Sequence, residues 1–548
     1  MTESSLDPYD DSMRLTRQRA LRHAAALGVS AAGAGAFLAA ADTVQASPSA
    51  AAVESIVGAK SGGTLKVALA ANFEDFDPQR SPFGNYPFIQ QLYNPILSDE
   101  NQPDASKPLP WLGRLKYARD SRYVDITVQP GIKFHDGKPL NAAAVIANLE
   151  KARHEVKGAD TKAAWDPIIG KLTKIDNLTA RLTYKQPTPS AYVTQLFALL
   201  GIVSPALIAG NYKALKTKAN GTGAFRLASY RQGDKAILKK NPTYFKKGLP
   251  YLDGIEFQFF SDPDAQVAAL ESGGAHMAVD VPPAYLERLR SRFQVKQGAP
   301  AICYEVLMSA DTGKPFAPKL ARQAMQHLVN RQRFCKDIMF GTCTPAYVHV
   351  DPKSLGYNPA YATRYPYDPE KAKAMFQQLG MLGKAPIKFM QLQGVLPGWG
   401  RLAEMVAGDM QAIGLNVQLD PQDFSVFGEN VWGSNKGNYQ MLTSFMGRGN
   451  RYPTFLSQGN IQLNAVANPA FPGSKPPAKY NEGFLKLSVA LTEKAQRKWA
   501  LQMTEAIMDE SWDIAVAYQR TQYAMVKNLQ GFVVSRDEHP ILERMSFT

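Results

Sequence analysis

Two hydrophobic periods alternate along this chain from about residue 64 onward, and together they restrict the fold to a mixed α/β architecture. Apolar residues at every second position predict half-buried strands over residues 65–69, 124–128, 178–184 and 255–259. Apolar residues three and four apart predict helices over residues 142–149, 321–328, 372–379, 402–413 and 499–507. A further strand is predicted over residues 415–419. Because strands and helices interleave, their apolar stripes are expected to be the core faces of α/β domains.

Length and composition narrow the class of protein. The 548 residues provide length for about three domains. A hydrophobic share of 45% and a charged share of 20% are ordinary for globular proteins, which excludes a mostly disordered or multi-span membrane chain. The 62 Lys and Arg residues exceed the 48 Asp and Glu residues by 14, which suits anionic ligands, a membrane surface or nucleic acid. The basic residues form no dense block, however, and nucleic acid is not an expected partner.

The first 46 residues have the composition of an export signal. Four arginines are followed by a weakly apolar run over residues 24–41, and Val44 and Ala46 are small side chains before a cut at Ser47. The arginine segment resembles a twin-arginine motif with Gln18 in place of the second arginine, which leaves open whether export uses the twin-arginine or the general secretory route. Residues 1–46 are therefore predicted to be a twin-arginine-like export signal, and residues 47–61 a linker.

A membrane anchor is the alternative to an export signal. The apolar run is rich in Gly and Ala, whereas a span needs about 20 strongly apolar residues, so a cleaved signal is favoured. No cysteine lies near the cut, and no lipid anchor is expected. The protein is predicted to be periplasmic.

Export makes the cysteines informative. Cys335 and Cys343 are eight residues apart, and in an oxidising compartment they are candidates for a disulfide that closes a short loop. Two free thiols are the alternative, because spacing alone does not determine pairing. Cys303 lies in an apolar run and is predicted to be a buried thiol.

Signals for catalysis, metals and cofactors are weak. The sequence has no Gly-x-Ser-x-Gly elbow, phosphate loop, HExxH motif or CxxC pair. The seven histidines have no second ligand at helical spacing, and neither a metal nor a cofactor is expected. His135 stands before an Asp-Gly turn, which favours a structural role.

Five sequence blocks, in order, resemble one family. They are GIKFHDGKPL (131–140), GTGAFRL (221–227) with NPTYF (241–245) and YLDGI (251–255), PF (315–316) with LARQAM (320–325) and NR (330–331), YDPEKA (367–372) through Gly380, and IGL (413–415). Over about residues 64–548 the chain resembles the extracytoplasmic solute-binding proteins of ABC importers, in the family 5 group that binds peptides, dipeptides, oligopeptides and nickel. Two positions depart from the family pattern, with Ala224 for the usual Pro and Phe245 for the usual Trp.

The resemblance implies a two-lobe periplasmic binding protein fold of class II, of the large type with an extra domain in lobe I and a ligand cleft between the lobes. Lobe I is then expected at 62–310 with the extra domain at 101–220, lobe II at 311–514, and a C-terminal segment returning to lobe I at 515–548. Such a monomer captures a small-molecule or peptide-like ligand by hinge closure and delivers it to an ABC permease in the inner membrane.

The resemblance also suggests ligand-binding residues. Peptide-binding relatives hold the ligand's ammonium with an aspartate in a loop reading roughly Trp-x-Gly-Arg-x-Asp-Pro. Here the matching stretch, residues 444–453, has Asn450 at the aspartate position, between Arg448 and Arg451. Because a buried ammonium needs an anion, this change favours a ligand with no free amine there, or one with anionic groups. In the alternative interpretation the two arginines face solvent.

Further candidates complete the predicted binding residues. Phe445 belongs to the same stretch as Asn450, and Asn72, Phe73 and Tyr304 are expected on the other wall by family analogy. Trp399, in a Gly/Pro-rich loop, either stacks on the ligand or packs inside lobe II. No catalytic residues are predicted.

Two other functions stay open at this point. A secreted hydrolase acting on an anionic substrate is the first alternative, although no carboxylate spacing identifies a catalytic pair. The second is a solute-binding fold that serves as a sensor partner or scaffold rather than in import.

Overall fold

The computed structural model describes residues 60–69, 75–79, 86–98, 109–154, 165–209, 213–350, 352–392, 397–422, 426, 430, 437–447, 471, 473–534 and 539–548. Residues 56–548 form one compact unit. None of the helices in these described ranges is both long enough and apolar enough to cross a membrane. The predicted export signal, 1–46, lies outside the described residues, as does nearly all of the predicted linker.

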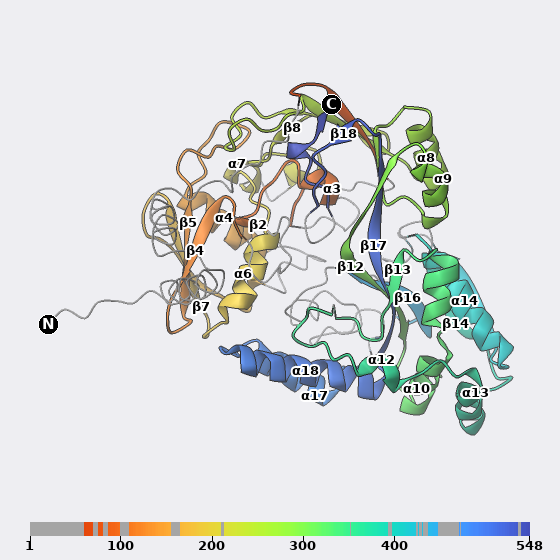
Figure 1. Cartoon of the computed structure of the whole chain (residues 1–548). Coiled ribbons are helices and arrows are strands. Elements are labelled where there is room, and N and C mark those ends of the chain that lie inside the picture. The colour runs from red at the N-terminus through yellow and green to blue at the C-terminus, as the bar shows by residue number, and fades with distance from the viewer. Residues whose placement is uncertain are drawn as a thin grey trace, which may run out of the picture. The chain divides into compact units, whose positions relative to one another are not determined.

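Eleven strands of the described chain form the main sheet (Figure 1). Their order is β15-β14-β16-β12-β17-β11-β1-β10-β9-β8, with β13 pairing with β17. The bounds are β1 Thr64–Leu69, β8 Phe225–Arg231, β9 Lys235–Lys240, β10 Gly254–Phe259, β11 Met277–Val279, β12 Gln294–Met308, β13 Cys343–Pro345, β14 Ile387–Leu392, β15 Val417–Gln422, β16 Met441–Gly447 and β17 Asp513–Met525.

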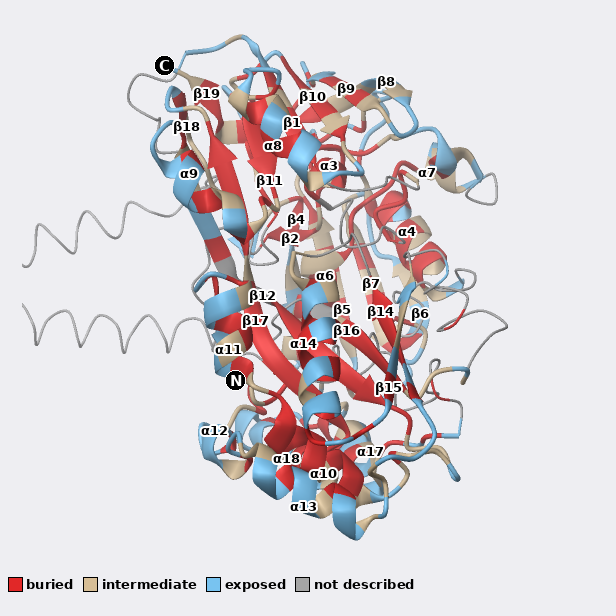
Figure 2. Cartoon of the chain, turned by 90° about the vertical axis from the view of Figure 1, so that its right-hand side faces the viewer, coloured by how far each residue is buried: buried red, intermediate tan, exposed pale blue. Residues whose placement is uncertain are grey.

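The two longest strands, β12 and β17, join two sets of strands. At one end β17 pairs with β11, next to β1, β10, β9 and β8; this set is called the β1 group. At the other end β12 pairs with β16, next to β14 and β15; this set is called the β14 group. The pairing of β12 with β17 shifts register between Gln297 and Ile302, and such bulges bend a strand locally. In Figure 2, β17 is buried along nearly its whole length.

A separate four-stranded sheet follows β1 in the chain, with the order β4-β5-β7-β6 (β4 Gly113–Tyr117, β5 Tyr123–Val128, β6 Ile169–Lys174, β7 Thr179–Tyr184). Val124, Ile126 and Val128 of β5 are buried, as their alternation predicted. The helix α4 (Ala142–His154) packs on this sheet. Asn141 caps α4, because its side-chain oxygen accepts a hydrogen bond from the Ala144 N–H at 3.0 Å.

Helices cover the main sheet on the right-hand side in Figure 1: α8 (Pro263–Glu271) and α9 (Leu286–Arg290) beside the β1 group, and α14 (Trp399–Ala412) on the β14 group. The remaining described elements are α3 Tyr86–Ile89, α6 Ser190–Leu199, α7 Pro205–Ile208, α10 Lys319–Leu328, α11 Arg331–Arg333, α12 Tyr361–Arg364, α13 Pro369–Gln378, α17 Ala478–Leu487, α18 Glu493–Glu510, the short helices η2 Lys213–Lys216, η3 Pro283–Tyr285, η4 Phe334–Ile338 and η5 Leu542–Arg544, and the two-stranded pairs β2 Leu97–Ser98 with β3 Leu109–Pro110 and β18 Leu529–Gln530 with β19 Ser546–Phe547.

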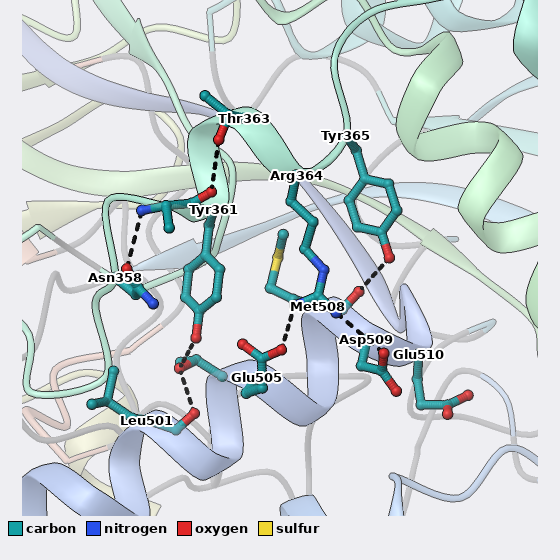
Figure 3. A network of polar contacts seen from close by, with 12 residues as sticks. Asn358, Tyr361, Thr363, Arg364, Tyr365, Leu501, Glu505, Met508, Asp509 and Glu510 are labelled. Atoms are coloured by element: carbon teal, nitrogen blue, oxygen red, sulfur yellow. Dashed lines mark hydrogen bonds and ion pairs between the residues drawn. The ribbon is translucent and has the colours of Figure 1, made fainter.

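Polar contacts fix α12 against α18 (Figure 3). Arg364 donates hydrogen bonds to Glu505 and Asp509, and the hydroxyls of Tyr361 and Thr504 are 3.2 Å apart. The long C-terminal helix predicted around Trp499 is therefore attached to the chain that follows β13.

The predicted helices are confirmed, and two boundaries differ from the prediction: the start of α14 and the start of the strand that follows it. Trp399, predicted in a loop, is the first residue of α14, which starts after Gly398. The strand predicted from residue 415 begins at Val417, because the Leu415 N–H bonds back to the Met410 carbonyl and closes the end of α14 first.

Candidate ligand-binding site

In open α/β sheets, ligand-binding residues lie at the carboxyl ends of the parallel strands. β1 runs parallel to β10 and β11, and β14 runs parallel to β15 and β16. The predicted residues Asn72 and Phe73 follow the end of β1, and Arg448, Asn450 and Arg451 follow the end of β16. All five lie outside the described residues, so their role stays a prediction. Tyr304, Trp399 and Phe445 are described.

These three aromatic residues form one cluster. Tyr304 in β12 is the register partner of Phe445 in β16, so the prediction that it lies on the opposite wall from Phe445 is wrong. The Phe445 ring meets the Trp399 ring edge-on, with centroids 5.2 Å apart. The Tyr304 hydroxyl donates to the carbonyl of Pro397 at 2.5 Å, two residues before Trp399. The structure thus brings together aromatic side chains that are up to 141 residues apart in sequence, at the carboxyl end of the β14 group.

The three aromatic residues of the cluster differ in how far they are buried. Tyr304 and Trp399 are fully buried, whereas Phe445 is half-buried. Burial raises the pKa of the Tyr304 hydroxyl well above its usual value, so it is a neutral donor at all physiological pH values. Tyr304 holds the chain that enters α14, and Trp399 packs in the apolar cluster around β14. Contact of either with a ligand stays a prediction.

Gly398 fixes the start of α14. Its φ is +75°, and a Cβ atom there would lie 2.6 Å from the Met339 sulfur. Only glycine fits this left-handed, closely packed position without strain. The Gly/Pro-rich composition around Gly398 predicted a loop there and did not indicate that a helix begins directly after it.

Asp280 was missed by the sequence analysis. It follows β11 directly, with a φ of +59°, and is half-buried. Its carboxylate is hydrogen-bonded to Thr521, and burial raises its pKa to about 6. The only sequence signal is a lone acid between Val279 and Val281, before two prolines, and nothing in the sequence places it beside β17.

The cysteines lie beneath the aromatic cluster. The Phe334 ring packs on Tyr304 with centroids 5.4 Å apart, and Cys335 is the next residue. Cys335 and Cys343 are buried free thiols in the structure, with their sulfurs 2.7 Å apart. A disulfide between them stays a prediction. Cys303 is a buried thiol, as predicted, and burial raises its pKa well above the usual value.

His135 occupies a structural turn. The ring lies 3.1 Å from the Gly223 carbonyl oxygen, and Gly137 has a φ of +84°. Burial lowers the His135 pKa to about 4, so the ring is neutral at pH 7. Within the described ranges, no group of three or more His, Cys, Asp or Glu side chains is arranged to hold a metal ion.

The fold is that of the two-lobe periplasmic binding proteins. It matches the dipeptide-binding protein of Pseudoalteromonas sp. SM9913 in complex with Met-Leu, with a TM-score of 0.80, 17% identity and coverage of 89% of this chain and 100% of the other. It also matches the ABC transporter-associated periplasmic binding protein DppA from Helicobacter pylori in complex with peptide STSA, with a TM-score of 0.77, 19% identity and coverage of 89% and 98%. The predicted fold class is confirmed.

The chain belongs to the bacterial extracellular solute-binding proteins of family 5, whose family model matches residues 107–463. Among curated relatives, the glutathione-binding protein GsiB of Pectobacterium atrosepticum is 26% identical over 426 residues, which cover 75% of this chain and 80% of GsiB. The protein is the substrate-binding component of an ABC transporter, and the comparisons give the hydrolase alternative no support.

Proposed function

We propose that this protein is exported to the periplasm, captures a small peptide-like solute that carries anionic groups, and delivers it to an ABC permease of the inner membrane. The observation that carries the proposal is family 5 membership combined with two strand groups joined through β12 and β17. Such a connection permits hinge closure, and a solute that contacts both groups favours the closed state by its differential affinity.

Relatives support a peptide-like solute. The relatives described above are named for glutathione or were solved with Met-Leu or the peptide STSA. Arg448 and Arg451 supply positive charge for carboxylates of the solute, and Asn450 in place of the family's aspartate leaves these charges uncancelled. The excess of 14 basic residues attracts an anionic solute at longer range.

The other parts of the proposal follow from the sequence. Asn72 and Phe73 line the site from the β1 group, and Tyr304, Trp399 and Phe445 support it from the β14 group. Lobe I comprises 62–310 with the extra domain at 101–220, lobe II comprises 311–514, and 515–548 returns to lobe I. The mature protein works as a monomer without a lipid anchor, cofactor or catalytic activity.

Native mass spectrometry of the purified mature chain tests the proposal. We expect one small, peptide-like or otherwise anionic molecule per chain, and less of it on Arg448→Ala at unchanged thermal stability. Arg290→Ala is the matched control, because Arg290 is 53% exposed and, among the described residues, its ion pair is with the exposed Glu287. Equal retention by Arg448→Ala removes Arg448 from the site. A retained molecule that is chemically converted during incubation contradicts the transport role.

A further inference from the structure

Asp280 stands at the carboxyl end of the β1 group, where the binding site begins. The residue before it, Val279, pairs with Leu69, the last residue of β1, and with Tyr523 of β17. Asp280 is therefore beside the point from which the chain continues to Asn72 and Phe73. Asp280 as a whole residue is half-buried, although one oxygen of its carboxylate is buried.

Among the residues that the structure describes, the carboxylate of Asp280 has no cationic partner. Its one hydrogen bond is to Thr521, and its Oδ1 atom is buried without a hydrogen bond. No Lys or Arg of the described chain forms an ion pair with it, in contrast to the buried Asp77, which pairs with Lys151. Leaving a charge unpaired in a low-dielectric site costs several kcal/mol, which a bound cation offsets.

A second acceptor without a partner lies on the same face of β17. Residues two apart on a strand share a face, which places Ala517, Gln519 and Thr521 together. Gln519 is buried, and its Oε1 atom accepts no hydrogen bond from the residues that the structure describes.

The same face leads to the aromatic cluster. Tyr304 is the register partner of Ala517, and the charge of Asp280 contributes to raising the Tyr304 pKa. Gln519 and Thr521, the hydrogen-bond partner of Asp280, thus lie on the face of β17 that continues to Ala517, the register partner of Tyr304.

Backbone conformation supports a functional reason for Asp280. Its φ of +59° is a left-handed conformation that few residues other than glycine adopt, and such residues concentrate at ligand sites. Asn accepts this conformation as readily as Asp does, so Asp280→Asn removes the charge while keeping shape and backbone.

We propose that Asp280, Thr521 and Gln519 form a subsite for a positively charged nitrogen group of the solute. Two buried acceptors without donors, one of them a carboxylate, fit an ammonium or guanidinium group and repel an anion. This inference rests on the proposed solute-binding function and sharpens it: the solute carries a cation as well as anionic groups. The cation is held from the β1 group, rather than from the loop after β16 where Asn450 has replaced the family's aspartate.

Calorimetric titration of the mature chain with glutathione and N-acetylglutathione tests the subsite. The two probes differ in one charged amine, and the wild-type chain is expected to bind glutathione about 10- to 100-fold more tightly. Asp280→Asn is expected to bind glutathione more weakly and the two probes about equally. Asp166→Asn is the matched control with wild-type preference, because Asp166 is 46% exposed and only pairs with Lys185 at the surface.

The outcomes separate the subsite from the general function. If the wild-type chain binds both probes equally, or if Asp280→Asn keeps the wild-type preference while remaining folded, the subsite is wrong and solute binding stands. If the wild-type chain binds neither probe, the peptide-like solute class proposed above is contradicted, and the amine subsite falls with it.

Discussion

Replacing Lys151 with Met breaks a buried ion pair between α4 and the segment 75–79. The Lys151 ammonium is 2.7 Å from one oxygen of Asp77 and 3.0 Å from the other, and the exposed fractions of the two side chains are 0% and 2%. Lys151 belongs to α4, whereas Asp77 lies on the segment that follows Asn72 and Phe73. The pair therefore ties residues 75–79 to α4, which packs on the four-stranded sheet.

The expected loss follows from this burial. Lys151→Met leaves the Asp77 carboxylate buried without its cation, and unpaired buried charges of this kind cost about 3–5 kcal/mol. Changing both partners, as Lys151→Met with Asp77→Asn, removes the charge as well as its partner, and the double variant should recover most of the loss. A surface pair offers the control: Lys185→Met, from a pair that is 50% and 46% exposed, should change stability by less than about 0.5 kcal/mol.

Urea unfolding followed by tryptophan fluorescence measures these differences. Trp165 is a suitable reporter, because it is fully buried against Phe197, with ring centroids 5.0 Å apart, in the same part of the molecule as α4. A Lys151→Met variant within 1 kcal/mol of wild type, or a double variant no more stable than the single one, would refute the reasoning.

Three further predictions concern the site. The folded-state pKa of Asp280 is raised to about 6 from 3.8, so ionisation of this carboxyl group opposes folding. As the pH rises from 4 to 7, the free energy of unfolding of the wild-type chain should fall by about 1–3 kcal/mol relative to that of Asp280→Asn. Equal pH profiles of stability for the two chains would contradict this. A disulfide between Cys335 and Cys343, whose sulfurs are 2.7 Å apart, is expected in the exported chain. In the unfolded chain both cysteines should then resist alkylation until a reductant is added. Alkylation of both thiols in the unfolded, unreduced chain would exclude the disulfide. Gly398→Ala should lower the stability measured by thermal unfolding by about 1–3 kcal/mol, because the alanine would have to adopt a φ of +75° and its Cβ atom would clash with the Met339 side chain. An unchanged stability would contradict this strain and show that the backbone before α14 can rearrange.

Local periodicity predicted the elements of this fold well. The buried positions of β5 and the capped start of α4 follow from alternation and from a single Asn, both of which are local properties. Errors occurred where a glycine sets the boundary, as at Gly398 and Gly414, since the conformation there depends on what packs against the backbone.

The site was predicted less completely, because its residues meet only through long-range pairing. Phe445 was proposed from the family resemblance and Trp399 from its place in a Gly/Pro-rich stretch, and the contact between their rings depends on β14, which precedes α14, pairing with β16. Asp280 was not predicted as a candidate because its partner Thr521 is 241 residues further along the chain. No periodicity or motif encodes such a neighbour.

Small-angle X-ray scattering of the mature chain, with and without saturating solute, tests hinge closure about β12 and β17 most directly. Hinge closure predicts a smaller radius of gyration with solute bound, and a transport role predicts recovery of that solute chemically unchanged. An unchanged radius of gyration at saturation would contradict closure.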